Sequence, residues 1–191
     1  MASTTTRLIL GLCALASAGC AAFGDAYEDA RLARQANPAP CPNAFALSDA
    51  ARMVVFDGEP GLDAVAWSAE VTDVRTSCRY AEDSPISAEV TLDLAVGRGP
   101  AARDDTLPLT YFVAVTRRDK DLIAKEEFTV PVTVRQGMAT VELSERVREI
   151  VIPRAGENTS GTNFEIAVGF ALSREQLLYN RSGRSLKFPE L

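Results

Sequence analysis

The sequence contains no histidine among its 191 residues. Without an imidazole the chain cannot build a Ser-His-Asp triad, a Cys-His pair or the common zinc sites that use histidine ligands. It also lacks a phosphate-binding loop and a dinucleotide fingerprint, so we expect no nucleotide partner and no cofactor. These absences predict a protein that is not an enzyme, and a hydrolase is the least favoured of the functions considered below.

Positive charge is also scarce, since 20 Lys and Arg residues face 26 Asp and Glu residues and the net charge is −6. An acidic chain lacks the basic face that nucleic acid requires, and it is not attracted to anionic lipid headgroups. Hydrophobic residues make up 47% of the chain and charged residues 24%, which is typical of a globular domain with a core. Any membrane attachment must therefore come from something other than charge.

The longest apolar run lies near the N-terminus, at residues 8–16, and is too short to span a bilayer. Arg7 precedes this run, small residues follow it at 17–19, and Cys20 comes next. A positive residue, a short apolar run and a small-residue site are typical of an export signal.

This stretch resembles the signal peptide of bacterial lipoproteins, in which the last four residues form a lipobox. Here the box is Ser17-Ala18-Gly19-Cys20, with Ser17 at a position where that family usually has Leu. The resemblance implies cleavage between Gly19 and Cys20 and attachment of acyl chains, such as palmitate, to Cys20. The alternatives are an ordinary secretory signal cut after Ala18 and an uncleaved anchor. With this signal and a single domain, the chain resembles uncharacterised proteobacterial envelope lipoproteins.

The resemblance also implies a location. The mature lipoprotein N-terminus carries three acyl chains, which hold a protein on a membrane stably. Ala21 follows the cysteine where an Asp would signal retention, which implies the outer membrane, facing the periplasm, rather than the inner membrane. The expected organisation is a signal peptide at 1–19, a lipidated N-terminus and flexible tether at 20–40, a domain at 41–181 and a loose tail at 182–191.

The chain has four cysteines. Cys13 lies in the signal and Cys20 is the acylation site, which leaves Cys41 and Cys78. An exported chain reaches an oxidising compartment, so we predict a disulfide between these two. The alternative is two free, buried cysteines. A redox role is not expected, because there is no Cys-x-x-Cys motif.

Alternation of apolar and polar residues begins near residue 43, and it is clearest from Ile86 to Val96. Such alternation, punctuated by turns, predicts an all-β fold: an antiparallel β-sandwich of 7–8 strands resembling immunoglobulin and fibronectin type III modules. An eight-stranded barrel is the structural alternative. A parity change predicts a bulge near 72–73, and Pro131 predicts an edge or bulged strand. Ser173 begins a capping-box pattern, which predicts a short helix at 174–180. The predicted strands are 65–71 with 74–80, 86–96, 109–115, 128–134, 139–143, 147–152 and 164–172.

Several polar or aromatic clusters are candidate sites, but most have a structural explanation. No metal site is predicted, because the acidic residues lie in turns without calcium-loop spacing. The adjacent Glu126 and Glu127 must face opposite sides of a strand, so they cannot act as a catalytic pair. Trp67 has the parity of a core residue. The remaining candidate for an interaction is Tyr179-Asn180-Arg181, whose alternative role is to cap an end of the sandwich. The acidic turn residues are Asp57, Glu59, Asp63, Asp104, Asp105, Asp119 and Asp121.

The leading hypothesis is a non-catalytic protein-interaction module of the cell envelope. Held by its lipid anchor, it would present an edge strand or its loop ends to another envelope protein. The alternative is a binder or carrier of a small apolar ligand between the sheets, where Ala69, Ala88 and Ala114 are expected to leave room.

Overall fold

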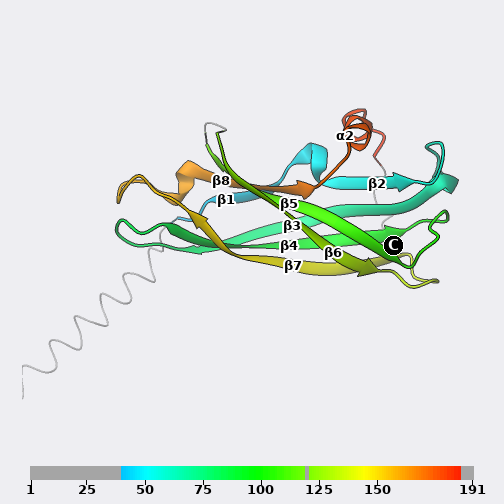
Figure 1. Cartoon of the computed structure of the whole chain (residues 1–191), viewed down its shortest axis with the longest axis horizontal. Coiled ribbons are helices and arrows are strands. Elements are labelled where there is room, and N and C mark those ends of the chain that lie inside the picture. Colours follow the sequence, from blue (N-terminus) through cyan, green and yellow to red (C-terminus); the bar gives the residue numbers. More distant parts are fainter. Residues whose placement is uncertain (1–39, 119–120, 186–191) are drawn as a thin grey trace, which may run out of the picture. The chain divides into compact units, whose positions relative to one another are not determined.

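The computed structural model describes residues 40–118 and 121–185, and they form a sandwich of two four-stranded sheets (Figure 1). The strand order is β1-β8-β5-β6 in sheet A and β2-β3-β4-β7 in sheet B. The predicted β-sandwich of 7–8 strands is therefore confirmed. The strands are β1 (Asn43–Ala46), β2 (Arg52–Phe56), β3 (Val65–Arg79), β4 (Ile86–Arg98), β5 (Thr106–Arg117), β6 (Leu122–Thr133), β7 (Thr140–Ile152) and β8 (Phe164–Phe170).

Pairing between neighbouring strands is antiparallel except at β1, which runs parallel to β8. This parallel pair departs from the purely antiparallel sandwich expected from the sequence. A tight turn forces two strands to run antiparallel, but β1 and β8 are the first and last strands and no hairpin joins them. Their direction is therefore set by how the chain enters and leaves the domain.

The predicted bulge in β3 is confirmed, because the register against β4 shifts between Val71 and Asp73. The hydroxyl of Thr72 donates a hydrogen bond to the carbonyl of Asp93 at 3.0 Å. One extra residue changes the parity of the strand, so Val74 returns to the face that Val71 occupies before the bulge. A single strand of 15 residues therefore replaces two shorter runs.

Strand β7 differs from the sequence prediction, which divided it into 139–143 and 147–152. The structure has one strand, Thr140–Ile152, with a register shift against β4 between Ala88 and Val90. Glu149 adopts a left-handed backbone conformation, with φ 61°. The extra residue changes the parity without ending the strand, which explains why the sequence pattern breaks here.

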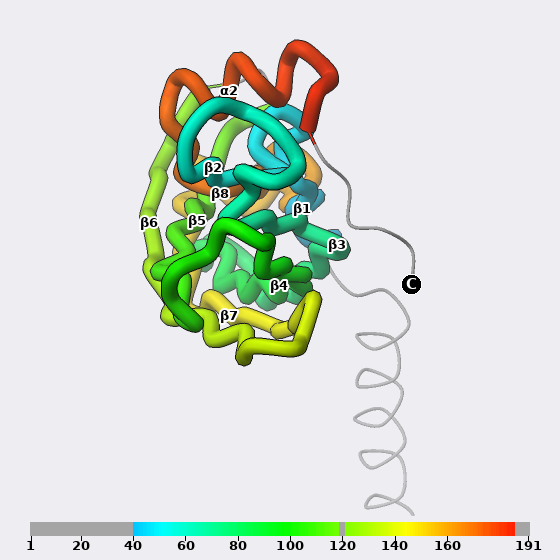
Figure 2. The backbone as a smooth tube through the Cα atoms, turned by 90° about the vertical axis from the view of Figure 1, so that its right-hand side faces the viewer, coloured from blue at the N-terminus to red at the C-terminus, as the bar shows by residue number. Residues whose placement is uncertain are grey.

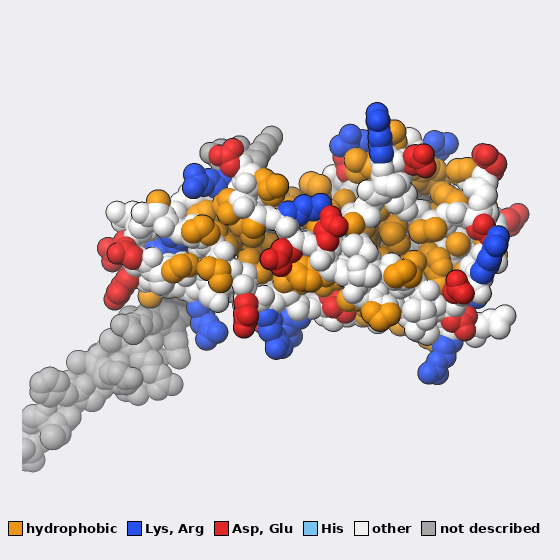
Figure 3. All heavy atoms as spheres, in the orientation of Figure 1, with side chains coloured by type: hydrophobic (Ala, Val, Ile, Leu, Met, Phe, Trp, Pro, Cys, Tyr) orange, Lys and Arg blue, Asp and Glu red, His pale blue; other side chains and the backbone are white. Residues whose placement is uncertain are grey.

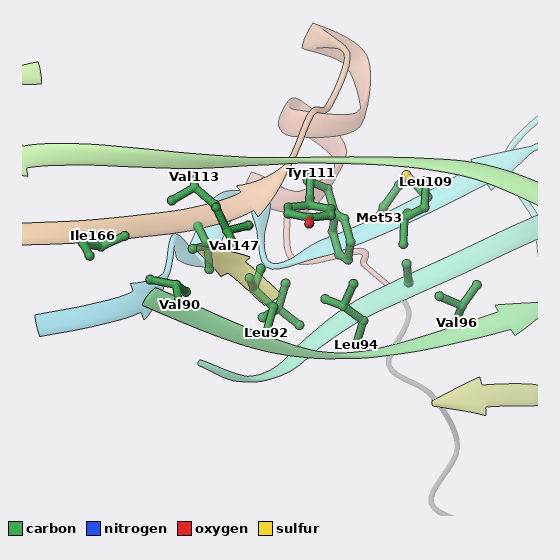
Figure 4. Packing of buried hydrophobic residues seen from close by; sticks show 14 of the residues in the cluster. Met53, Val90, Leu92, Leu94, Val96, Leu109, Tyr111, Val113, Val147 and Ile166 are labelled. Carbon is green, nitrogen blue, oxygen red and sulfur yellow. The ribbon is translucent and has the colours of Figure 1, made fainter. Parts of the chain in front are cut away.

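The core lies between the sheets, and β4 supplies its centre with Val90, Leu92, Leu94 and Val96 (Figure 4). Residues of β5 and β8 pack against them from sheet A, including Leu109, Tyr111, Val113 and Ile166. Trp67 is 6% exposed, which confirms its predicted core position.

Of the three alanines expected to point inward, Ala69 and Ala88 belong to this core. The expectation was wrong for Ala114, which lies opposite Lys125 and Ala167 and has the parity of the outer face. Because Val113 and Val115 hold the inward positions, the residue between them must face outward.

The predicted C-terminal helix is confirmed as α2 (Arg174–Arg181). Its capping box is complete: Gln176 N donates to Ser173 Oγ at 3.2 Å, and Ser173 N donates to Gln176 Oε1 at 2.9 Å. The helix lies beside β2 and the 3₁₀ turn η1 (Ser48–Ala50) (Figure 1). No helix in the described part of the chain is long and apolar enough to cross a membrane.

In the end view of Figure 2, β6 lies on the opposite side of the domain from β1 and β3. We call the side formed by β1, β2, η1 and α2 the closed side. The side where β6 ends sheet A and β7 ends sheet B is called the open side.

Candidate functional site on the open side of the sandwich

The predicted lipidation and cleavage residues, Gly19 and Cys20, lie outside the described residues, as does the tether up to residue 39. The predicted disulfide between Cys41 and Cys78 is confirmed. It joins residues 37 positions apart, with a Cα–Cα distance of 5.6 Å, and links the segment before β1 to the end of β3.

The same corner of the closed side is tied further by Tyr80, whose hydroxyl donates to Pro40 O at 2.7 Å and accepts from Gly161 N at 2.9 Å. A Cβ at Gly161 would lie 2.1 Å from the carbonyl oxygen of Pro40. Glycine is therefore required at position 161, which lies against the residues where the chain enters the domain.

The candidate cluster Tyr179-Asn180-Arg181 lies on α2, and all three side chains make contacts within the domain. Tyr179 packs edge-on against Phe56 with ring centres 5.4 Å apart, and Arg181 pairs with Asp49 at 2.7 Å. Asn180 Nδ2 donates to the carbonyls of Asp49 and Arg52, at 2.9 and 2.8 Å. These contacts attach the helix to η1 and β2.

Helix α2 also satisfies the free edge of β2. The Val71 N to Ala51 O bond of 2.9 Å shows that the odd-numbered residues of β2 face β3, so Arg52 and Val54 face outward. Asn180 and Gln176, one helical turn apart, donate to the carbonyls of Arg52 and Val54 at 2.8 and 3.2 Å. The helix thereby occupies two carbonyl acceptors of the β2 edge, and it lies where an added strand would have to pair.

On the open side, the free edge of β6 is formed by its odd-numbered residues. Val134 N donates to Asp105 O at 2.8 Å, so the even-numbered residues bond to β5 and the odd-numbered residues face away. The outward residues include Lys125, Glu127, Thr129 and Pro131. Pro131 has no N–H, so one donor is missing from this edge, and the prediction of an edge strand at Pro131 is confirmed.

The free edge of β7 has no such interruption over its first half. Arg98 N donates to Ala139 O at 3.0 Å, so the odd-numbered residues up to Val147 face β4. Thr140, Glu142, Ser144 and Arg146 therefore direct their backbone N–H and C=O groups outward. Within residues 40–118 and 121–185, no strand pairs with this edge or with that of β6.

Between the two free edges lies a small space of about 110 Å³. Its apolar wall comes from both sheets and includes Val113, Phe128, Val147 and Ile150. Hydrophobic side chains also remain visible among charged ones on the face shown in Figure 3. The open side thus gives access to partly buried apolar residues of both sheets, including Phe128 and Ile150.

Two carboxylates occupy inward positions near this opening. Glu126 is opposite Val113, and Glu145 is opposite Leu92. Neither forms an ion pair with another described residue.

Tyr111 is 2% exposed and stacks on Phe128 with ring centres 5.5 Å apart. Burial raises the pKa of Tyr111 to about 12, and the negative charge of Glu145 adds to the rise.

The outer faces of the edge strands carry exposed ion pairs. Lys125 pairs with Glu127 at 2.8 Å on β6, while Arg146 and Arg148 of β7 lie 3.4 and 3.3 Å from Glu89. Exposed pairs of this kind contribute about 0–1 kcal/mol each. They leave these side chains available to a partner at little cost.

A second group of charges lies beside Ser144 on the outer face of sheet B. Arg75 contacts both Asp73 and Asp93, the latter at 2.7 Å. Hydrogen bonds from Arg75 and then Ser144 hold the pKa of Asp93 below its usual value. Hydrogen bonds to Asp93 and then to Asp73 raise the pKa of Arg75. The side chain of Ser144 therefore adjoins this group of charges, while its backbone N–H and C=O belong to the free edge of β7.

Some of the acidic turn residues pair with arginines, and those that the structure describes do not gather into a metal site. Asp57 accepts hydrogen bonds from Arg103 at 2.9 and 2.6 Å, and Asp105 lies 3.4 Å from Arg98. Glu126 and Glu127 face opposite sides of β6, as their partners in β5 show. Among the residues that the structure describes, which exclude Asp119, no three potential metal ligands come together.

No protein-family model and no curated protein matches the chain. Among solved structures, it is similar to the variable (V) domain of the AgI/II polypeptide BspA of Streptococcus agalactiae, with 14% identity. That match covers 64% of this chain and 74% of that chain, with a TM-score of 0.18. At so low a TM-score the similarity carries no inference about function.

Proposed function

We propose that the protein is a lipid-anchored, non-catalytic interaction module, whose open side binds another protein of the cell envelope. The observation that carries the proposal is the contrast between the two sides of the sandwich. The edge of β2 is satisfied by two helix side chains, whereas β6 and β7 present free backbone groups. A free edge can pair with an extended segment of another protein, which gains main-chain hydrogen bonds from it.

Side-chain contacts at the opening support the same function. Phe128 and Ile150 are only partly buried and lie beside the free edges. An extended segment added here would alternate its side chains between these apolar residues and the solvent. Backbone pairing would supply affinity, and the apolar opening with Glu126 and Glu145 would supply specificity.

The anchor is part of this proposal and rests on the lipobox at residues 17–20. With acyl chains on Cys20, the domain would be held at a membrane, most simply the periplasmic face of the outer membrane. The intact mass of the mature protein from membranes tests this assignment. Diacylglyceryl-Cys20 with two hydrogens missing from the Cys41–Cys78 pair is expected. A lipid-free species that starts at Gly19 or Cys20 would contradict it.

The alternative function, carriage of a small apolar ligand between the sheets, receives less support. Ligand sites for drug-sized molecules usually occupy roughly 300–1,000 Å³. The space between the sheets at the open side is about 110 Å³, and Glu126 lies at its rim. The larger hollows, of about 480 Å³ each, lie on the outer face of sheet B and beside α2, and neither is between the sheets.

Site-specific photo-cross-linking in intact cells tests the interaction. A photoreactive residue replaces Glu127 on β6 or Glu142 on β7, and Glu175 on α2 serves as the control because it is exposed on the closed side. We expect an adduct with a discrete envelope protein from an open-side position and not from Glu175. Equal adducts from all three positions, or none from the open side, would contradict the proposed function.

A proline substitution distinguishes edge pairing from general proximity. Thr129→Pro removes an N–H that faces away from β5, so it leaves the backbone hydrogen bonds between β5 and β6 intact. It does remove the exposed side-chain hydrogen bond of 2.9 Å between the hydroxyls of Thr129 and Thr110. We expect this variant to fold and to lose the adduct formed at β6. An adduct of unchanged yield would show that the partner does not pair with this edge.

A further inference from the structure

On the free edge of β7, a negative and a positive side chain lie at equal distances on either side of Ser144. Glu142 lies two residues before Ser144 and Arg146 lies two residues after it, and all three face outward from the sheet. When two copies of such a strand run antiparallel about Ser144, residue 142 of each copy lies opposite residue 146 of the other. The edge is therefore complementary to itself.

We propose that β7 binds a second copy of this chain, with Ser144 on the two-fold axis. In this register Glu142 lies opposite Arg146 of the partner subunit, and the symmetry produces that pair twice. The outward N–H and C=O groups of 142, 144 and 146 are those that the new ladder would use. The two B sheets would join into one sheet of eight strands, closed by a two-fold axis.

Other registers of the same edge are less favourable. Centring the pair on residue 142 or 146 places two like charges opposite each other, which destabilises a pair of strands. Centring it on Leu143 places Glu142 opposite Ser144 of the partner subunit, with no opposite charge. Centring it on Glu145 brings that inward carboxylate against its own copy. Only the register centred on Ser144 forms two pairs of opposite charge without such a clash.

The edge of β6 is less suited to self-pairing. The register that sets Lys125 opposite Glu127 of a second copy also places Glu126 opposite itself on the inward face. Pro131 removes a donor further along that strand. The contact of Arg146 with Glu89 does not prevent pairing through β7, because it spans 3.4 Å at an exposed position. In the proposed dimer, both β6 edges stay free for the envelope partner.

Cysteine cross-linking in the full-length chain tests the register directly. Directly opposed residues of a hydrogen-bonded antiparallel pair have Cα atoms about 5.5 Å apart, which suits a disulfide. We expect Ser144→Cys to give a disulfide-linked dimer under mild oxidation. Thr140→Cys is the matched control, since it keeps both charges and its copies would lie roughly 27 Å apart along the strands. Equal cross-linking of both variants, or none at Ser144→Cys, would overturn the proposal.

Charge reversal tests the pairing of Glu142 with Arg146. We expect Glu142→Arg and Arg146→Glu each to weaken the dimer on the order of tenfold or more, because two attractive pairs become repulsive. The double variant should recover most of the loss. Light scattering of the full-length protein in detergent over a range of concentrations measures the dissociation constant. A double variant as weak as the single ones would overturn the charge pairing.

This inference adds to the proposed function and can fail separately from it. A chain that stays monomeric but still forms adducts from Glu127 would remove the dimer alone. A dimer through Ser144→Cys without any adduct to another protein would remove the envelope partner alone.

Discussion

The closed and open sides of this sandwich differ in how their edge strands are completed. On the closed side, a disulfide, the hydroxyl of Tyr80 and the amides of Gln176 and Asn180 attach short strands to their surroundings. On the open side, β6 and β7 are 12 and 13 residues long, and no described segment pairs with their free edges. The shortest strands are thus fixed by the most contacts, and the longest edges have the fewest.

This difference indicates what each side contributes. Short strands bury little apolar surface, so β1 and β2 need covalent and side-chain attachments to remain in place. Long strands are held by the ladder on their paired side and can leave the other side free. An exposed edge is normally a risk of aggregation, and β6 reduces that risk with Pro131. The first half of β7 contains no proline, so all of its outward N–H groups can donate to a specific partner.

The largest expected effect concerns the closed side. Replacing both Cys41 and Cys78 with Ala should lower the free energy of unfolding by about 3–4 kcal/mol, because the bridge restricts a long loop of the unfolded chain. Urea denaturation of the parent and the variant measures the loss. Reductant should reproduce it in the parent and have no effect on the variant. A loss below about 1 kcal/mol would show that the other closed-side contacts suffice.

The next effect concerns Tyr111, next to the open side. Its pKa is raised by burial to about 12 in the folded state, compared with about 10 in an unfolded chain. The corresponding stability is present below about pH 10 and is lost as the pH rises toward 12, by about 2 kcal/mol. Unfolding free energies measured from pH 9 to 12 should fall more steeply for the parent than for Tyr111→Phe. Parallel curves would contradict the shift.

A smaller effect is expected from Asn180, which holds α2 on the closed side. Asn180→Ala removes hydrogen bonds to the carbonyls of Asp49 and Arg52 and should cost about 1 kcal/mol. Amide hydrogen exchange in Arg52–Phe56 should become faster as well. Arg174→Ala is the matched control, because that exposed side chain makes no hydrogen bond or ion pair with described residues. The same cost in both variants would contradict the role of Asn180.

The smallest effect on stability is expected at Pro131, on the open side. Pro131→Thr restores an N–H to the free edge of β6 and should change the free energy of unfolding by less than about 0.5 kcal/mol. Light scattering should show faster self-association of this variant, since the edge gains a donor. Pro108→Thr is the control, because Pro108 lies opposite Pro131 but its own N faces away from that edge. Faster association of both variants would assign the effect to the loss of proline alone.

The sequence predicts those features of the fold that depend on neighbouring residues. The bulge near Thr72, the capping box of Ser173 and the edge position of Pro131 each rest on a local signal, and each is confirmed. The disulfide is predicted from the count of cysteines together with the expectation that the chain is exported, and the bond itself is confirmed. These features need no knowledge of which distant strands pair.

Features that depend on distant pairing are less predictable. Strands β1 and β2 have only four and five residues, which is too few for a clear alternation. The partner of β1 is β8, which lies far away in the sequence. The first half of β6 escapes prediction for another reason. It carries Glu126 at an inward position, which is tolerated only because the open side reaches solvent there. The charged residue at an inward position, which marks the open side, is also what breaks the alternation from which a strand is predicted.

The disulfide also determines how mechanical load enters the domain. Tension on the residues before Cys41 reaches two places at once: β1, through the main chain, and β3, through the sulfur atoms. Because β3 is the longest strand and pairs on both edges, force is distributed into the middle of sheet B. The four-residue strand β1 therefore does not have to resist a pull on the residues before Cys41 by its hydrogen bonds to β8 alone.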